Sequence, residues 1–222
     1  METKNIKLMM SETLSHYNAD QVVQGDYWNK MSKRGCFIGC LTHSYDPAGV
    51  TDKFGLELPL VKLLESIFER LPESEAKEFF KDIPVAIGSD GRDLSLVKWA
   101  FLRDTLKSLP EQGKAAHEVI DPVIVGMDLL ASGKDWDAVN AADAAYNVHS
   151  YDDEDSAAYA AFAAATCAEK RNVPDEAVEV VESAETAAIR SSPVITRESA
   201  ERDGVSECRR QAASLLTLIK AA

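Results

Sequence analysis

Residues 59–72 read Pro-Leu-Val-Lys-Leu-Leu-Glu-Ser-Ile-Phe-Glu-Arg-Leu-Pro, and this stretch decides the fold class. Its apolar residues recur every three or four positions, which is the spacing of one face of an α-helix. Proline is tolerated in the first turn of a helix but cannot continue one, so Pro59 and Pro72 mark the two ends. The pattern predicts an amphipathic core helix between the two prolines.

The segments that follow this helix show the same helical period, and no convincing pair of strands is present. Ser74 is a good N-cap for a second helix, whose apolar stripe runs up to Pro84. A third stripe covers residues 94–106, and a shorter helix is expected over residues 122–130. We therefore predict an all-α domain with a bundle-like arrangement of helices.

Alanine dominates two blocks in the second half of the chain, residues 138–145 and 157–168. Because alanine is the best helix former, both blocks predict helices, and two more are expected over residues 176–189 and 199–221. The acidic run at residues 152–155 is expected at a helix N-terminus, where the helix dipole favours negative charge. Small side chains let such helices pack closely, so we expect a homo-oligomer.

The composition changes near residue 133. We predict a mixed-composition helical domain at residues 1–132, which contains the Cys/His segment, and an acidic, Ala-rich helical region at residues 133–222 that packs on it. The formal net charge of the chain is −13, and residues 135–190 alone carry −10. This acidity disfavours nucleic acid as a partner, because affinity for a polyanion comes from basic surfaces that release counterions.

No apolar run reaches the roughly 18 to 20 residues that a membrane span needs, and the first ten residues lack the apolar core of a signal peptide. The four cysteines are too few and too unevenly spaced for a disulfide scaffold. We expect a cytoplasmic protein with reduced thiols and no membrane partner.

Cys36, Cys40 and His43 form the local cluster that could carry chemistry. They stand at positions i, i+4 and i+7, so they share one face if the helix is continuous. A thiolate beside an imidazole is a nucleophile, and the same side chains can ligate zinc. Gly35 and Gly39 weaken such a helix, and the spacing offers no fourth metal ligand. We favour buried structural thiols, followed by the wall of a ligand pocket and then by catalysis or metal binding; no metal or cofactor is expected.

Three basic residues between positions 30 and 34 lie beside Gly35 and could cradle a phosphate, because glycine lets backbone amides approach an anion. A solvated basic edge is the alternative interpretation. In so acidic a chain, a basic spot next to Tyr27 and Trp28 indicates an anionic, aromatic ligand such as a nucleotide. The predicted ligand-binding residues are Tyr27, Trp28, Lys33, Arg34, Gly35, Cys36, Gly39, Cys40 and His43.

The remaining histidines and the common catalytic motifs offer little. His16, His117 and His149 have no partner at close spacing, so no role is assigned to them. The chain contains no Walker loop, no dinucleotide fingerprint, no His-Glu-x-x-His zinc motif and no Gly-x-Ser-x-Gly motif. A non-catalytic binding protein is therefore favoured over an enzyme.

A resemblance to a known family rests on residues 33–43, Lys-Arg-Gly-Cys-Phe-Ile-Gly-Cys-Leu-Thr-His, together with Trp28 before them. With Gly-Leu-Glu-Leu-Pro at residues 55–59, residues 64–72, and Asp-Leu-Ser-Leu-Val at residues 93–97, the chain resembles a family of uncharacterised phage and bacterial proteins. These share a Gly-Cys-x-x-Gly-Cys-x-x-His core, a Leu-Gly-x-Pro helix and an Ala-rich tail. The chain departs from them at residues 56–59, where it has Leu-Glu-Leu-Pro in place of a glycine-containing Leu-Gly-x-Pro, and in the acidic character of its tail.

The resemblance implies a mobile-element setting in the cytoplasm of a bacterial host and implies no mechanism. We therefore expect an accessory protein that binds a host protein or a small anionic, nucleotide-like ligand, for instance as a counter-defence inhibitor. One alternative is an enzyme that depends on the Cys/His pair or on a metal. Another is a structural oligomer that assembles through the Ala-rich helices.

Overall fold

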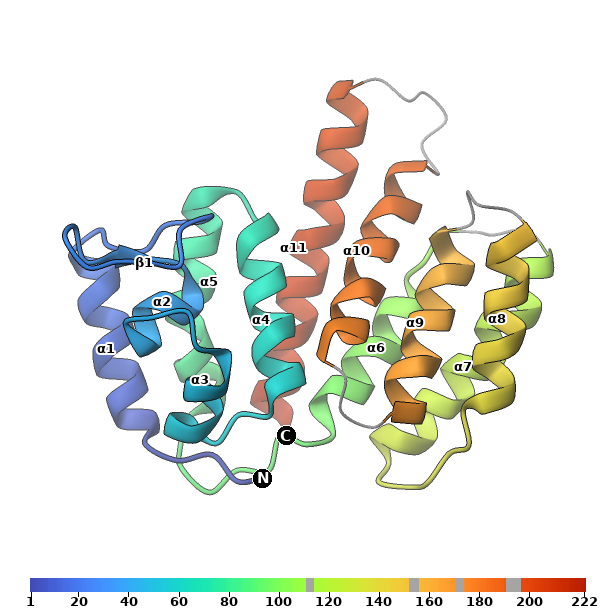
Figure 1. Cartoon of the computed structure of the whole chain (residues 1–222), viewed down its shortest axis with the longest axis horizontal. Coiled ribbons are helices and arrows are strands. Elements are labelled where there is room, and N and C mark those ends of the chain that lie inside the picture. Colours follow the sequence, from blue (N-terminus) through green and yellow to red (C-terminus); the bar gives the residue numbers. More distant parts are fainter. Residues whose placement is uncertain (111–113, 152–155, 171–173, 191–196) are drawn as a thin grey trace. The chain divides into compact units, whose positions relative to one another are not determined.

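The computed structural model is built almost entirely from helices (Figure 1). This confirms the all-α class predicted from the helical periods. The structure describes residues 1–110, 114–151, 156–170, 174–190 and 197–222. The acidic run expected at a helix N-terminus, residues 152–155, lies outside the described residues.

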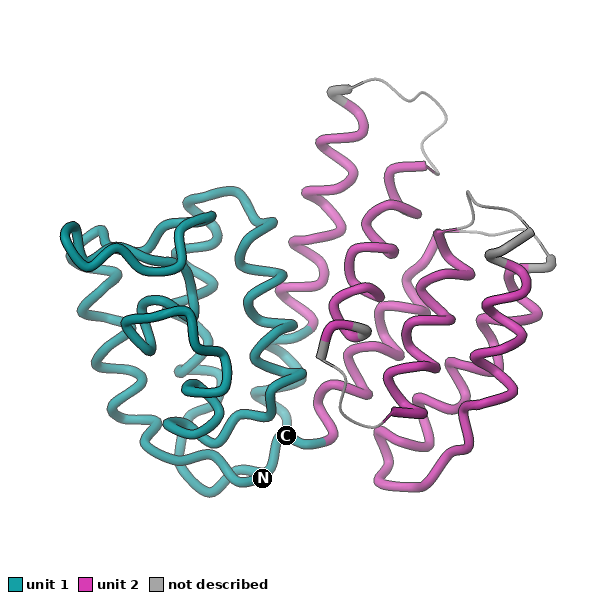
Figure 2. The backbone as a smooth tube through the Cα atoms, in the orientation of Figure 1, with its two compact units in different colours: residues 1–95, 215–222 teal, residues 96–214 magenta. Residues whose placement is uncertain are grey.

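The chain forms two compact units (Figure 2). Unit 1 contains residues 1–95 and 215–222, and unit 2 contains residues 96–214. The predicted change of composition at residue 133 falls inside unit 2, between two of its helices. The boundary suggested by composition therefore differs from the boundary between the two compact units.

Unit 1 combines helices with one short antiparallel strand pair, in which Trp28 faces Gly35. This pair of two-residue strands was not predicted, because segments so short show no alternation of apolar and polar residues. The elements of unit 1 are α1 (Ile6–Asn18), β1 (Trp28–Asn29), β2 (Arg34–Gly35), α2 (Phe37–Thr42), α3 (Pro47–Phe54), α4 (Leu58–Arg70), α5 (Glu73–Ile87) and the end of α11 (Arg197–Ala221).

The helix predicted over residues 59–72 is present as α4, with proline in its first turn. Two predictions about α5 are wrong. α5 begins one residue before Ser74, which therefore lies in the first turn and is not the N-cap. α5 also runs through Pro84 to Ile87 and is followed by Gly88, which has a φ of 80°. Ile83 and Ile87, in the same turns of the helix as Pro84, are fully buried, and this packing offsets the backbone hydrogen bond that a proline removes.

The core of unit 1 gathers around α2, whose first five residues are all buried. α2 contacts α1, α3, α4 and β2. Phe37 of α2 meets Phe80 of α5 edge to face, with 5.9 Å between ring centroids, and Phe80 also contacts Phe68 of α4. A helix enclosed on all sides is apolar all round. This explains why residues 37–41 show no amphipathic period.

Unit 2 contains the Ala-rich helices, which were predicted correctly. Its elements are α6 (Val97–Lys107), α7 (Lys114–Ala131), α8 (Val139–Tyr151), α9 (Ser156–Lys170), α10 (Pro174–Arg190) and most of α11. α9 contacts α7, α8 and α10 and is buried along most of its length, which its small side chains permit. The helix expected to start at Pro122 is longer than predicted: α7 begins at Lys114 and includes Pro122.

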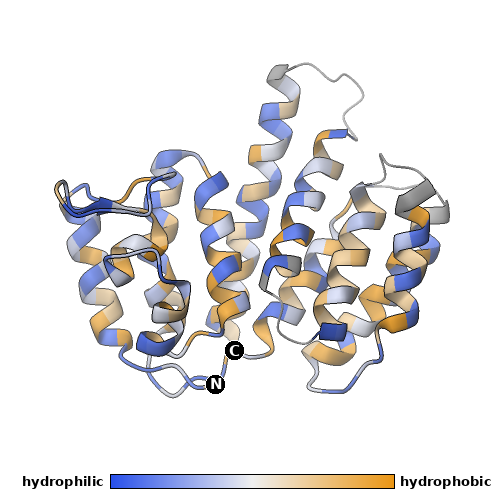
Figure 3. Cartoon of the chain, in the orientation of Figure 1, coloured by the Kyte–Doolittle hydropathy of each residue, from blue (hydrophilic) through white to orange (hydrophobic). Residues whose placement is uncertain are grey.

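Many helices of both units carry hydrophobic and hydrophilic residues side by side, as amphipathic helices do (Figure 3). Within the described part of the chain, no helix has both the length and the apolar character that crossing a membrane needs.

Candidate functional site

A pocket of about 710 Å³ lies on unit 1, at the side of α1 that faces the strand pair and the end of α2. This volume is in the usual range for small-molecule sites. Three of the nine predicted ligand-binding residues, Trp28, Lys33 and His43, lie in its wall. The complete wall is formed by Glu12, Ser15, His16, Ala19, Gln21, Trp28, Lys30, Lys33 and His43.

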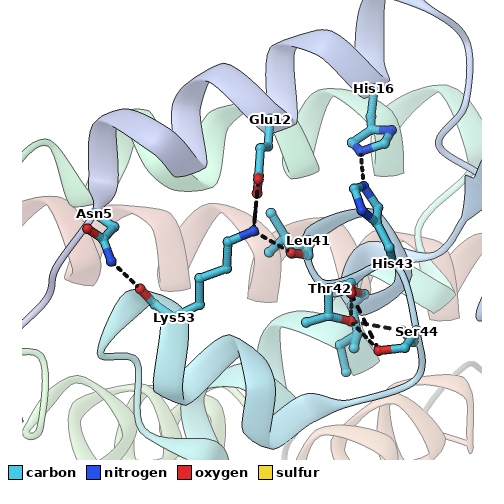
Figure 4. A network of polar contacts seen from close by, with 9 residues as sticks. Asn5, Glu12, His16, Leu41, Thr42, His43, Ser44 and Lys53 are labelled. Carbon is cyan, nitrogen blue, oxygen red and sulfur yellow. Dashed lines mark hydrogen bonds and ion pairs between the residues drawn. The ribbon is translucent and has the colours of Figure 1, made fainter.

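Two imidazole rings meet in this wall, and Figure 4 shows them pointing toward each other. Nε2 of His16 lies 3.2 Å from Nε2 of His43. His16 belongs to the buried face of α1 and is 8% exposed. His43 is exposed and follows the last residue of α2 in the left-handed backbone region, with a φ of 55°. The structure thus pairs a buried ring with an accessible one.

Gln21 sets the proton positions of this pair. Its Oε1 lies 2.8 Å from Nδ1 of His16, and an amide oxygen only accepts hydrogen bonds, so Nδ1 of His16 carries the proton. Nε2 of a neutral His16 is then an acceptor, and His43 donates from its own Nε2. Partial desolvation of the ring, and next the proximity of His16, lower the pKa of His43, which favours its neutral form.

Trp28 completes an aromatic cluster with His16 and His43. The Trp28 ring lies 4.6 Å from the His43 ring at a tilt of 30°, and it meets the His16 ring edge on at 5.6 Å. β1 supplies Trp28, and its partner Gly35 makes room for the indole: a Cβ on Gly35 would lie 2.9 Å from Cε3 of Trp28. We call His16, Trp28 and His43 the imidazole–indole cluster.

The uncompensated charge of the pocket wall is positive. Lys30 and Lys33 are exposed, and neither forms an ion pair with any residue that the structure describes. The acid in the wall, Glu12, is neutralised by Lys53, whose Nζ lies 2.7 Å from Oε2 of Glu12 and also donates to the carbonyl of Leu41 (Figure 4). The pocket therefore favours an anion.

Two other predicted ligand-binding residues lie outside this wall. Arg34 is exposed, and its guanidinium lies 3.8 Å from a carboxylate oxygen of Asp20. Tyr27 is 55% exposed and packs against Tyr45, with 3.8 Å between ring centroids and a tilt of 41°. Neither side chain contributes to the pocket.

Cys36 and Cys40 are buried, and they do not share a helical face with His43. The shared face required a continuous helix, but Cys36 is the N-cap of α2 and His43 lies beyond its last turn. Burial raises the pKa of Cys36 to about 11 and that of Cys40 to about 12. Both thiols are protonated at neutral pH, which agrees with structural thiols and opposes an activated nucleophile.

Gly39 serves close packing of the backbone. A Cβ on Gly39 would lie only 1.4 Å from the carbonyl oxygen of Tyr27, so α2 packs directly on the chain that leads into β1. Gly35 contacts the same oxygen, at 2.4 Å from its ideal Cβ position. Both glycines therefore allow a close approach of backbone to backbone.

Sequence reasoning missed His16 and Gln21. His16 lies 27 residues from His43 along the chain, so no local motif joins them. A signal was available, because Ile6, Met9, Thr13 and His16 follow a helical spacing that puts His16 on the buried face of α1. His117 is exposed, with Nδ1 3.9 Å from Oδ1 of Asp121, and the side chain of His149 lies outside the described residues.

Among the described residues, no group of three or more His, Cys, Asp or Glu side chains is arranged to hold a metal ion. The comparisons with protein-family models, with curated proteins and with solved structures found no match. The resemblance to phage and bacterial proteins therefore stays a prediction.

Proposed function

We propose that unit 1 is a non-catalytic binding module for a small anionic ligand that carries an aromatic ring, such as a nucleotide. The observation that supports this proposal is the placement of Lys30 and Lys33 in the same pocket wall as Trp28. The chain has a net charge of −13, so its surface repels anions in general. Two lysines without an acidic partner in the described part of the chain make this pocket a local exception.

Each part of such a ligand has a matching group in the wall. The ammonium groups of Lys30 and Lys33 can neutralise a phosphate or carboxylate through charge-assisted hydrogen bonds. The rings of the imidazole–indole cluster offer aromatic edges and faces to a planar base. Gln21 and Ser15 add polar groups that can fix the orientation of the ligand.

A module of this kind suits an accessory role in a bacterial cytoplasm, in which the protein sequesters a nucleotide signal or blocks a host protein. This role, its counter-defence setting and assembly through the Ala-rich helices of unit 2 are part of the proposal. Neutral, buried thiols offer no support for the alternative of a thiol-dependent enzyme.

The test is calorimetric titration of the full chain with nucleoside mono-, di- and cyclic phosphates, with inorganic phosphate and a nucleoside as partial ligands. We expect the double substitution Lys30→Ala, Lys33→Ala to weaken nucleotide binding by about tenfold for each lysine, or about 1.4 kcal/mol each. The matched control is Lys4→Ala, Lys7→Ala, which changes the net charge equally at two exposed residues outside the wall.

Retained affinity in the control and lost affinity in the pocket variant support the proposal. Equal losses in both variants would show that overall charge, and not this pocket, controls binding. If none of the nucleotides or partial ligands binds, the proposal is abandoned.

A further inference from the structure

His16 and His43 bring two ring nitrogens together from separate elements, α1 and the end of α2. We propose that these two nitrogens form a two-histidine site for a divalent transition-metal ion such as Zn²⁺. The site lies in the pocket wall and uses Nε2 of each ring as a ligand. It was not expected from the sequence, in which the metal candidates were Cys36, Cys40 and His43.

The separation of the two nitrogens fits a shared metal ion. Zn²⁺ binds histidine nitrogen at about 2.0–2.1 Å with tetrahedral geometry, which places two such nitrogens about 3.3–3.4 Å apart. The observed distance between Nε2 of His16 and Nε2 of His43 is 3.2 Å. Figure 4 shows that the two rings approach each other through these nitrogens. Only a small increase in the distance between the two nitrogens is therefore needed for them to share a metal ion.

The surroundings of His16 are those of a metal ligand. A histidine that binds a metal usually donates its other N–H to a protein oxygen, which holds the ring and leaves the ligating nitrogen unprotonated. Gln21 accepts the Nδ1 proton of His16 in this way, at 2.8 Å. His16 is also 8% exposed and packed against Trp28, so the ring has little freedom to turn away.

Metal binding conserves the protons of both rings. In the tautomer in which Nε2 of His43 donates to Nε2 of His16, the proton of His43 moves to Nδ1 of the same ring on metal binding, and Nε2 becomes free to bind the ion. The charged groups that face His43 are Glu12, Lys53 and Lys33. A metal ion binds an imidazole through an unprotonated nitrogen.

Two protein ligands leave coordination positions for water or for a bound anion. Glu12 is held by Lys53, and the cysteines are buried outside the pocket wall, so none of these is needed as a ligand. Lys30 and Lys33 line the same pocket and can hold an anion that also contacts the metal. This last role of the anion rests on the proposed function; the metal site itself does not.

The experiment uses the full chain, freed of metal by chelator and dialysis, and titrated with Zn²⁺ by calorimetry and with Co²⁺ by visible absorption, without nucleotide. We expect one ion per chain, with affinity rising from Mn²⁺ to Co²⁺ to Ni²⁺. His43→Asn is the main variant, because His43 is exposed and asparagine tolerates its positive φ. It should weaken Zn²⁺ binding by roughly 100-fold or more, and Gln21→Ala by roughly 10- to 100-fold.

The matched control is His117→Asn, at an exposed histidine of unit 2, which should bind Zn²⁺ like the original chain. Three results would each overturn the proposed site. These are absence of Zn²⁺ binding, a Zn²⁺ affinity that His43→Asn leaves unchanged, and a thiolate charge-transfer band in the Co²⁺ spectrum. Nucleotide titration of the metal-free protein separates the two proposals. Lysine-dependent nucleotide binding without metal binding defeats only this inference, and histidine-dependent metal binding without nucleotide binding defeats only the proposed function.

Discussion

Replacing Gly39 by alanine tests whether α2 packs directly on the backbone before β1. The added Cβ would lie 1.4 Å from the carbonyl oxygen of Tyr27, and ordinary contact begins at 3.4 Å, so the two segments must separate by about 2 Å. Overpacking a core costs about 1–3 kcal/mol, and a clash with backbone belongs at the upper end of that range. Alanine gains about 1 kcal/mol over glycine inside a helix, so we expect a net destabilisation of about 2 kcal/mol.

Urea unfolding of the full chain, followed by circular dichroism, measures this change as a lower midpoint. The matched control is Gly204→Ala in α11, where the two atoms nearest to the Cβ would be ends of side chains, Oε1 of Glu185 at 2.9 Å and Cδ1 of Ile189 at 3.2 Å. Those ends can move, so the helix propensity of alanine should dominate in the control. A Gly39→Ala variant that is as stable as the original chain would refute the packing of α2 on the Tyr27 carbonyl.

Three further predictions concern the same unit. At neutral pH, Cys36 and Cys40 should react with iodoacetamide far more slowly than free cysteine, because burial raises their pKa to about 11 and about 12; an equal rate would contradict their burial. By NMR titration, the pKa of His43 should lie below that of an unfolded histidine. The unfolded chain then binds more protons at His43 between the two pKa values, so the contribution of His43 to the free energy of unfolding falls as the pH drops through that interval. His43→Asn should remove this contribution. Gln24→Ala should lower the free energy of unfolding by about 2 kcal/mol, because two carbonyls near the end of α4 lose their side-chain donor; a loss under about 0.5 kcal/mol would show those bonds to be unimportant.

The helices with one buried face could be predicted from the sequence. The rule that proline marks the end of a helix was not sufficient by itself. α4 shows a regular apolar face and was predicted with its prolines at the ends. Pro84 and Pro122 were also read as ends, yet both lie inside helices. Burial of neighbouring side chains decides such cases, and burial depends on partners far away in the sequence. α2 has almost no exposed face, so its sequence lacks the recurring apolar and polar positions that would predict a helix.

The candidate site could be predicted only in its local part. Trp28, Lys33 and His43 lie within one short segment, and the structure places all three in the pocket wall. His16 and Gln21 precede that segment, and they reach the wall because β1 pairs with β2 and backbone bonds join Gly35 to residues 21 and 23. Spacing along the chain cannot reveal a contact that depends on this pairing.

The length of α2 explains why the thiols and the imidazole of one motif have different surroundings. Cys36 and Cys40 lie at its start and in its middle, where four elements enclose them, and their thiols are neutral packing groups. α2 ends at Thr42, and the left-handed backbone of His43 turns the chain so that the imidazole meets His16 in the pocket wall. One more helical turn would have placed His43 on the face of the cysteines. The early end of α2 therefore removes the thiol–imidazole pair and creates the pair of histidines.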